Sequence, residues 1–293
     1  MKRSLYRVRS RIVRHVAEAL IDRRVALFLG AGISRPMGLP DWNQLTRNLF
    51  TVRHRHPPRV IRPMQDADRI RFAHRSYTKY LETVQAALYH GVKVDLDLLH
   101  SNKTLNAIAA MAMNSRRGNA RAIFTLNYDD LLERHLAHYG LVVKPVFENS
   151  DRGGTSDVIV YHAHGFLSSP KSPFLGRSSS LLLDQTSYSE ALADRYDWWS
   201  GEMIATLKSQ LVLFIGLSGE DVKFDAHLME AKSSNYFVAR GEPFWGFALK
   251  ERPRKVDVDW WEKRGVVVLP LKNYHSDLPD FLFSVCQAAA SLA

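Results

Sequence analysis

The sequence predicts an α/β fold in which helices cover both faces of a doubly wound, mainly parallel β-sheet. Short runs of continuously apolar residues recur along the chain, and segments with apolar residues at helical spacing separate them. Strands buried on both faces have such continuous runs, because neither face meets water. Two of the runs, 25–29 and 211–215, lead directly into glycine, which indicates turns that leave the sheet. We therefore expect a Rossmann-like architecture, in which ligands bind beyond the carboxyl ends of the strands.

The N-terminal part of the chain predicts helices around one buried strand. Apolar residues at helical spacing predict an amphipathic helix over 5–22, before the strand at 25–29. Asp41 and Gln44 resemble a capping box, which predicts a helix from there to about Phe50. Three prolines mark a loop before a long segment of helical pattern. We expect a single domain over 1–293 with a helical insertion at about 51–114.

After this segment the alternation of strands and helices returns. Strands are predicted at 122–126, 141–146, 158–161, 211–215, 244–249 and 266–269. Helices are predicted at 128–138, at 185–208 and from about 278 onward.

Composition excludes several classes of protein. The chain has 293 residues, 46% of them hydrophobic, which is enough to bury a substantial core. No apolar run is long enough to span a bilayer, and the basic start is not followed by the apolar stretch of a secretory signal, so we expect a cytoplasmic protein without membrane contact. The single cysteine, Cys286, lies on the apolar face of a predicted helix and excludes a four-cysteine zinc module.

The charge balance favours anionic partners without selecting one. The formal net charge is +10, and basic residues gather near 2–24 and 53–62. Nucleotide phosphates, nucleic acid and an acidic partner protein all fit this charge. Each cluster taken alone also fits an ordinary solvated face.

The first chemical motif follows the strand at 25–29 and has the sequence Gly-Ala-Gly-Ile-Ser. A glycine turn after a strand lets a phosphate approach the main chain closely, or it serves only as a tight connection. The motif departs from the ordinary dinucleotide fingerprint: Arg35 occupies the third glycine position, and no strand ends in Asp or Glu about 20 residues downstream. If this loop binds a dinucleotide, it does so differently from a dehydrogenase.

Three further motifs follow predicted strands. Asn127 and Asp129 begin a helix, where they act on a ligand or simply cap the helix and complement its dipole. His162 and His164 precede a glycine; a metal pair needs both on one continuing strand, and a lone histidine is more often structural. The fourth motif, Gly-Leu-Ser at 216–218, allows another backbone approach to a ligand or forms an ordinary turn.

Together the four motifs resemble the sirtuin family in kind, order and placement, from about residue 25 to residue 275. The segment 30–34 is similar to the family's Gly-Ala-Gly-Ile-Ser, and 38–41 to its Gly-Ile-Pro-Asp. The segment 125–129 matches its Thr-Gln-Asn-Ile-Asp element, 164–165 its catalytic His-Gly, and 216–218 its Gly-Thr-Ser. Protein-deacylating sirtuins also carry a four-cysteine zinc module, which this chain cannot build. The segment 128–133 is closer to the zinc-free sirtuin-like domains of bacterial anti-phage defence proteins.

This resemblance implies that NAD is a substrate, cleaved to nicotinamide and ADP-ribose, and that zinc is not required. It implies Asn127 and His164 as catalytic residues, with Asp129 orienting Asn127 or nicotinamide. The implied NAD-binding residues are Gly30, Ala31, Gly32, Ile33, Ser34, Asp41, Asp129, Gly216 and Ser218.

Two other classes of function compete with an NAD hydrolase in anti-phage defence. The same cleavage serves a protein deacylase or an ADP-ribosyltransferase, and a non-catalytic module would sense the nucleotide or support assembly. We also expect a homo-oligomer or a partner such as a HerA-type translocase ATPase, because unrestrained NAD hydrolysis would deplete a shared metabolite. The basic segments leave nucleic acid open as a further partner.

Overall fold

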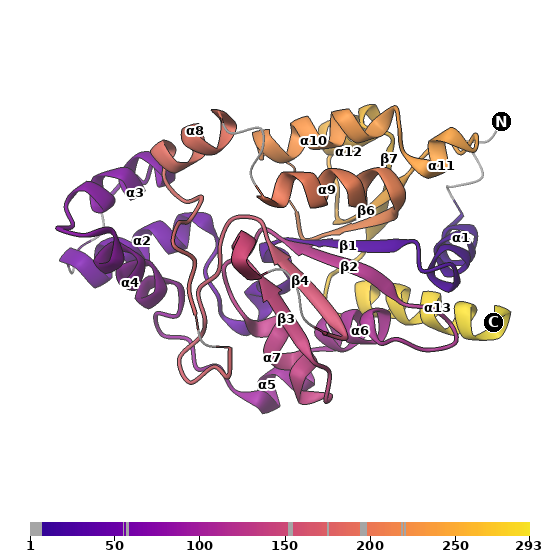
Figure 1. Ribbon diagram of the computed structural model, residues 1–293, viewed down its shortest axis with the longest axis horizontal. Helices are drawn as coiled ribbons and strands as arrows, with labels where there is room; N and C mark the ends of the chain where they lie inside the picture. Colours follow the sequence, from indigo (N-terminus) through magenta and orange to yellow (C-terminus); the bar gives the residue numbers. More distant parts are fainter. Residues whose placement is uncertain are drawn as a thin grey trace.

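A seven-stranded parallel sheet forms the centre of the molecule (Figure 1). The computed structural model describes residues 8–54, 56, 59–151, 155–174, 176–193, 198–217, 219 and 221–293. Within them the strand order is β3-β4-β2-β1-β5-β6-β7, and every neighbouring pair is parallel. The strands are β1 (Val25–Leu29), β2 (Ala120–Thr125), β3 (Val143–Val146), β4 (Val158–His162), β5 (Leu211–Ile215), β6 (Gly246–Glu251) and β7 (Val266–Leu271). This confirms the predicted fold class.

The central strands follow from their apolar runs. All five residues of β1 and all five of β5 are buried, and the two strands pair from Val25 opposite Leu211 to Leu29 opposite Ile215. Edge strand β3 buries only its first and last residues. The continuous runs therefore mark strands in the middle of the sheet, which have neighbours on both sides and helices on both faces.

The strand order reverses beside β1. From β1 the chain builds the sheet through β2 to β4 and β3 on one side, and then crosses to β5, β6 and β7 on the other. At such a reversal the connections leave the sheet in opposite directions, so a crevice opens at the carboxyl ends of the two central strands. The loops after β1 and β5 lie at this crevice.

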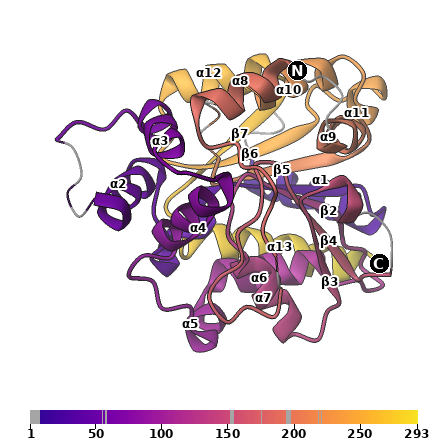
Figure 2. The same cartoon turned by 60° about the vertical axis from the view of Figure 1, so that its left-hand side comes forward.

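Helices form a layer on each side of the sheet (Figures 1 and 2). One layer contains α1 (Arg9–Ile21), α6 (Lys103–Ala112), α7 (Leu131–His138) and α13 (Asp277–Leu292), with α5 (Leu96–Ser101) at its margin. The other contains α9 (Trp198–Ser209), α10 (Val222–Lys232), α11 (Tyr236–Ala239) and α12 (Lys255–Lys263). In α13 the sole cysteine, Cys286, is buried against Met111 of α6, so its predicted place on an apolar helix face is confirmed.

A third group of helices lies beyond the carboxyl ends of the strands, at the left of Figure 1. It contains α2 (Trp42–His54), α3 (Pro63–Phe72), α4 (Tyr77–Leu88) and α8 (Gln185–Ala193). The guanidinium of Arg71 on α3 bonds the buried carboxylate of Asp184, just before α8, at 2.7 Å. This group therefore joins the helical segment near 51–114 to a segment a hundred residues later. The division of the chain into domains stays a prediction.

Some predicted boundaries differ from the structure. Asp41 accepts the backbone N–H of Gln44 at 2.9 Å, as the capping box requires, but the side chain of Gln44 bonds Asn48 instead of reaching back. Helix α7 starts at Leu131 rather than at 128. The helix predicted over 185–208 consists of α8 and α9, and residues 194–197 between them lie outside the described part.

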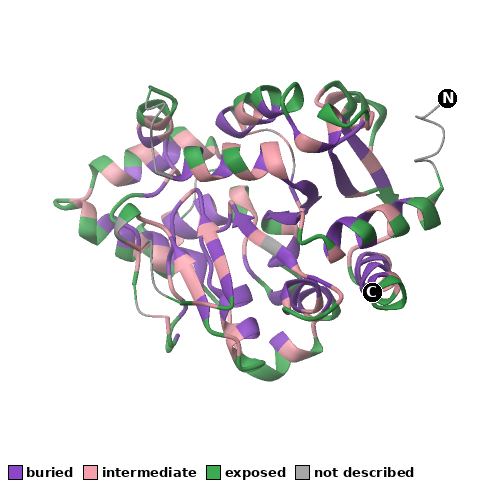
Figure 3. Cartoon of the chain, turned by 45° about the vertical axis from the view of Figure 1, so that its right-hand side comes forward, coloured by how far each residue is buried: buried purple, intermediate pink, exposed green. Residues whose placement is uncertain are grey.

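Burial follows this layered arrangement. The strands are largely buried and the outer faces of the helices are exposed (Figure 3). Trp245 and Trp261 are among the largest fully buried side chains, and both pack against Phe214 of β5. Among the described residues no helix combines the length and apolar character needed to cross a membrane.

Candidate active site

A pocket of about 610 Å³ opens at the carboxyl ends of β1, β2, β4 and β5. Its volume lies within the range of small-molecule sites. Helices α2 and α4 close it from the other side with apolar residues that include Trp42, Leu45 and Leu88. Of the residues predicted to act on NAD, the pocket is lined by Gly30, Ala31, Ser34, Asp41, Asn127, Asp129, His164 and Gly216.

The glycines at the crevice bring two loops into backbone contact. A Cβ atom on Gly30 would lie 2.6 Å from the carbonyl oxygen of Gly216, and one on Gly32 would lie 2.8 Å from the Cα atom of Gly216. Gly30 itself has φ −127°, which other residues adopt readily, whereas Gly216 has φ +71°. The loop after β1, here called the first loop, thus needs glycine at both positions because the second loop, after β5, approaches its backbone so closely. Gly216 in the second loop must also be glycine because its backbone is left-handed.

The first loop uses most of its backbone donors within the protein. The N–H of Gly30 bonds the carbonyl of Ile215 at 2.9 Å, and the N–H of Gly32 bonds that of Gly216 at 3.3 Å. The N–H groups of Ile33 and Ser34 bond carbonyls inside the loop. In the described part of the chain, the N–H of Ala31 has no such partner, and Ala31 is exposed in the pocket. A phosphate approaching the main chain of this loop would therefore find one free donor rather than several.

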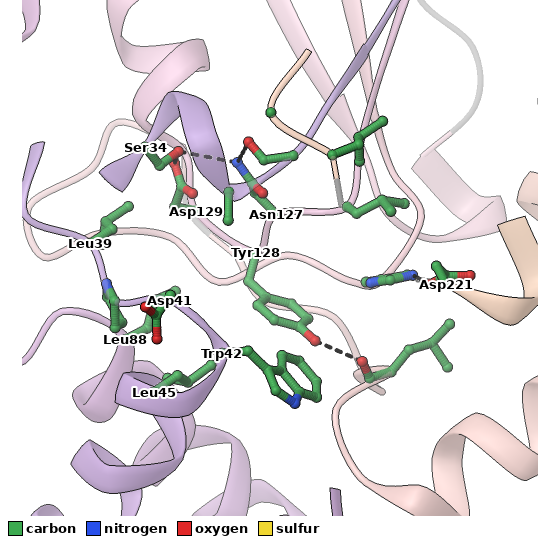
Figure 4. A pocket seen from close by; sticks show the side chains of 18 of the residues that line it. Ser34, Leu39, Asp41, Trp42, Leu45, Leu88, Asn127, Tyr128, Asp129 and Asp221 are labelled. Atoms are coloured by element: carbon green, nitrogen blue, oxygen red, sulfur yellow. Dashed lines mark hydrogen bonds and ion pairs between the residues drawn. The ribbon is translucent and has the colours of Figure 1, made fainter. Parts of the chain in front are cut away.

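The side-chain amide of Asn127 is fixed by two hydrogen bonds. Its Nδ2 donates to the carbonyl oxygen of Gly30 at 3.2 Å and to Oγ of Ser34 at 3.1 Å (Figure 4). The carbonyl oxygen can only accept, so the nitrogen of the amide must face Gly30 and its oxygen Oδ1 remains as an acceptor. The alternative that Asn127 caps the next helix is wrong, because Asp130 occupies the N-cap position of α7.

Asp129 extends this chain of hydrogen bonds. Oγ of Ser34, which accepts from Asn127, donates to Oδ1 of Asp129 at 3.2 Å, and the N–H of Leu131 also donates to that oxygen. Burial, with a further contribution from the carboxylate of Glu133, raises the pKa of Asp129 to about 7. Asp129 is therefore linked to Asn127 through Ser34, and its raised pKa lies near neutral pH.

His164 lines the same pocket and lies beside a carboxylate. Its Nε2 is 2.9 Å from Oδ2 of Asp221, and the side chains of both are 12% exposed. The hydroxyl of Tyr188 also donates to Asp221. Burial opposes the charge of Asp221, but the electrostatic attraction of His164 and the hydrogen bonds from His164, Tyr188 and the N–H of Phe224 outweigh it and hold the pKa of this carboxyl below its usual range.

His162 has a separate, structural environment. Its Nε2 lies 2.6 Å from Oε1 of Glu133 and its Nδ1 lies 3.0 Å from the carbonyl oxygen of Asn127. Burial disfavours the charged ring, yet Glu133 and the Asn127 carbonyl outweigh burial and raise the pKa of His162. Each histidine is thus bound by its own carboxylate. Gly165, with φ +105°, turns the chain after them.

Three predicted residues do not line the pocket or cannot be located. Gly32 supports the contact with Gly216, and Ile33 is buried in the core. Ser218 lies outside the described residues. Asp41 lines the pocket, but it also caps α2 and pairs with exposed Arg35 at 3.5 Å.

Tyr188 and Asp221 are among the polar residues of the pocket that the sequence interpretation missed. Asp221 had a local signal, since it follows the Gly-Leu-Ser turn and is the N-cap of α10, where its side chain accepts from Phe224. Tyr188 had none, because α8 reaches the pocket only through tertiary packing.

The described residues contain no group of three or more histidine, cysteine or acidic side chains able to hold a metal ion. In a comparison with protein families, residues 121–269 match the model of the SIR2-like domain. The match covers just over half of the chain and includes Asn127, His164 and Asp221, but it begins after β1 and its glycine loop. No curated protein matches the chain significantly.

Proposed function

The chain belongs to the SIR2-like domain family, whose domain implies an NAD-related activity, and on that premise we propose that this protein hydrolyses NAD to nicotinamide and ADP-ribose. One observation carries the proposal. Asn127 after β2 and His164 after β4 line the same pocket, at the crevice where the loops after β1 and β5 meet. A strand reversal of this kind is where open α/β sheets bind nucleotides.

In the proposed reaction, the bond between the ribose and nicotinamide breaks and its electron pair leaves with nicotinamide. The ribose acquires oxocarbenium character, so the site must hold the ring and direct water to it. Oδ1 of Asn127, left as an acceptor by the two bonds of Nδ2, accepts a ribose hydroxyl or the attacking water. His164 takes a proton from the ribose or from water, as histidine can at neutral pH.

Other parts of the pocket suit the rest of the substrate. The free N–H of Ala31 offers one donor to the pyrophosphate at the first loop. The apolar residues from α2 and α4 suit a planar ring. Ser34 and Asp129 hold Asn127 in place rather than contacting the reacting atoms, and we propose the same supporting role for Gly30, Gly32 and Gly216.

The test is release of nicotinamide from NAD by purified protein, with free ADP-ribose measured as the second product. Asn127→Ala and His164→Ala are each expected to lower the rate at least ~100-fold, because each removes a group that acts on the reacting centre. Both variants should remain folded. The matched control is His138→Ala, which removes an exposed histidine at the far end of α7. Wild-type rates in both site variants would contradict the site.

The products also separate this proposal from its alternatives. A deacylase or an ADP-ribosyltransferase releases nicotinamide but transfers the ribose to an acyl-lysine or a protein, so free ADP-ribose would not accumulate without an added acceptor. A sensor would bind NAD without releasing nicotinamide. Free ADP-ribose formed in the absence of any protein acceptor supports the hydrolase.

We further propose that the protein acts in the cytoplasm in anti-phage defence by depleting NAD, and that assembly controls the reaction. The motivation is the similarity of 128–133 to defence proteins, and the need for a low-activity state in an enzyme that consumes a shared metabolite. A second copy or a HerA-type ATPase is the proposed partner. Mass measurement in solution, paired with nicotinamide release at each assembly state, tests this. A monomer with full activity at every concentration, unaffected by the ATPase or by nucleic acid, would refute it.

A further inference from the structure

The carboxylate of Asp221 is held by three donors. Its Oδ1 accepts the N–H of Phe224 at 2.7 Å, in the first turn of α10. Its Oδ2 accepts the hydroxyl of Tyr188 and lies 2.9 Å from Nε2 of His164. Both oxygens are therefore engaged, by two groups from other elements and one from its own helix. The carboxylate cannot turn away from His164 without losing several hydrogen bonds.

These contacts determine which nitrogen of His164 carries a proton. Because the pKa of Asp221 lies below its usual range, the group is a carboxylate at neutral pH and can only accept hydrogen bonds. The nitrogen that faces it, Nε2, must then be protonated. In a neutral imidazole the other nitrogen, Nδ1, has no proton and can accept one. Within the described part of the chain no group hydrogen-bonds to Nδ1 of His164.

We infer that Asp221 is a positioning residue, which fixes His164 with its proton on Nε2 and so makes Nδ1 the atom that accepts a proton during NAD cleavage. The inference rests on the proposed hydrolysis. An aspartate behind a histidine base acts in this way in hydrolases of unrelated fold, where it also stabilises the imidazolium that forms.

The step balances in atoms and charge. The bond from C1′ of the ribose to nicotinamide breaks, and its electron pair neutralises the pyridinium ring. The oxygen of water forms the new bond to C1′, and a proton of this water passes to Nδ1 of His164. The imidazolium then lies against the negative charge of Asp221 until it releases the proton to solvent.

The decisive variant is Asp221→Asn, tested by nicotinamide release and by ¹⁵N NMR of protein labelled at histidine. Asparagine keeps an oxygen to cap α10 but can turn an NH₂ group toward Nε2, which then must accept, so the proton moves to Nδ1. We expect kcat to fall at least ~100-fold with a smaller change in KM, since the loss concerns the base. In the NMR spectrum the His164 ring, identified by its absence in His164→Ala, should change from the Nε2–H to the Nδ1–H form.

Two further variants separate positioning from folding. Asp95→Asn makes the same change at the N-cap of α5, remote from the pocket, and should alter neither readout. Tyr188→Phe removes one of the donors to Asp221 and should give a smaller loss of kcat with the Nε2–H form retained.

The NMR readout does not depend on turnover, so the inference and the proposed function can fail separately. A wild-type protein that does not release nicotinamide contradicts the hydrolase. An Nδ1–H ring in the wild type, or an Asp221→Asn protein with unchanged ring form and unchanged kcat, overturns the positioning role.

Discussion

Two carboxylate–histidine pairs lie at the end of β4, and they differ in almost every property that matters for function. In the inner pair, His162 and Glu133 are 0% and 1% exposed. In the outer pair, His164 and Asp221 are each 12% exposed and both line the pocket. The inner pair joins β4 to α7, whereas the outer pair joins the β4 turn to the start of α10.

The difference distinguishes a histidine–carboxylate pair that is enclosed in the protein from one that lines a pocket. His162 uses both ring nitrogens inside the protein, one toward Glu133 and the other toward the Asn127 carbonyl. His164 uses one nitrogen, Nε2, toward Asp221, and no group in the described part of the chain bonds its Nδ1. The inner pair thus supports the loop that carries Asn127, and the outer pair lines the pocket in which we propose that NAD binds. Four substitutions or treatments test this division, in order of decreasing expected effect.

The largest effect is expected from Glu133→Ala, which leaves His162 buried without its carboxylate. Loss of one partner of a buried ion pair costs about 3–5 kcal/mol of stability. The pKa of His162 is raised, so the contribution of the pair is complete below the ordinary histidine pKa and is lost as pH rises through the folded value. Urea denaturation near pH 6 measures the loss of stability in Glu133→Ala relative to the wild type.

A control for this variant is Glu82→Ala, which breaks an exposed pair with Arg177 and should cost less than about 1 kcal/mol. If the two variants were equally stable, the inner pair would not have the structural role assigned to it.

A smaller loss is expected when both partners of the inner pair are replaced together, as in Glu133→Met with His162→Phe. No charge is then left buried, and apolar replacements of similar volume often match a buried ion pair in stability. The double variant should recover about 2 kcal/mol or more relative to Glu133→Ala, measured by the same denaturation. A double variant less stable than Glu133→Ala would mean that the attraction between Glu133 and His162 stabilises the fold by more than the burial of their charges costs.

Asp129→Asn is expected to change the pH dependence of stability. Burial raises the pKa of Asp129 to about 7 from an ordinary value of 3.8, so the folded state favours the protonated carboxyl. The free energy of unfolding of the wild type should therefore fall between about pH 4 and pH 7. The amide that replaces the carboxyl in the variant cannot ionise in this pH range. The free energy of unfolding of the variant should therefore fall less than that of the wild type, by a few kcal/mol at most. Exposed Asp259→Asn serves as the comparison, and parallel pH profiles for wild type and Asp129→Asn would refute the assignment.

No effect is expected from chelators. Each histidine at the end of β4 is already bound by a carboxylate, and one cysteine cannot supply the zinc module of deacylating sirtuins. Nicotinamide release and the unfolding transition should both survive treatment with a zinc chelator. Loss of either that zinc alone restores would reverse this prediction.

The elements that the sequence predicted well are those whose cause is local. Runs buried on both faces marked β1 and β5, and turns after strands marked Gly30, Asn127, His164 and Gly216, which line one pocket. Such residues are found because the carboxyl ends of parallel strands share one edge.

What the sequence did not predict depends on contacts between distant segments. Tyr188 reaches Asp221 across 33 residues, and the partner of His162 is Glu133 in another element. The sequence analysis related the glycines of the first loop to a close approach of phosphate or to a tight connection. In the structure they are required by the approach of Gly216, more than 180 residues away. No spacing rule within one segment contains this information.

The contact between Gly30 and Gly216 also limits how this chain can vary. A methyl group on Gly30 would meet a backbone oxygen rather than a flexible side chain, so the second loop itself would have to shift. That loop precedes Asp221 in the sequence, so the displacement would reach His164, which is paired with Asp221. We therefore expect descendants of this sequence to exchange the apolar side chains around the pocket far more freely than these glycines, and substrate preference to diverge faster than the chemistry.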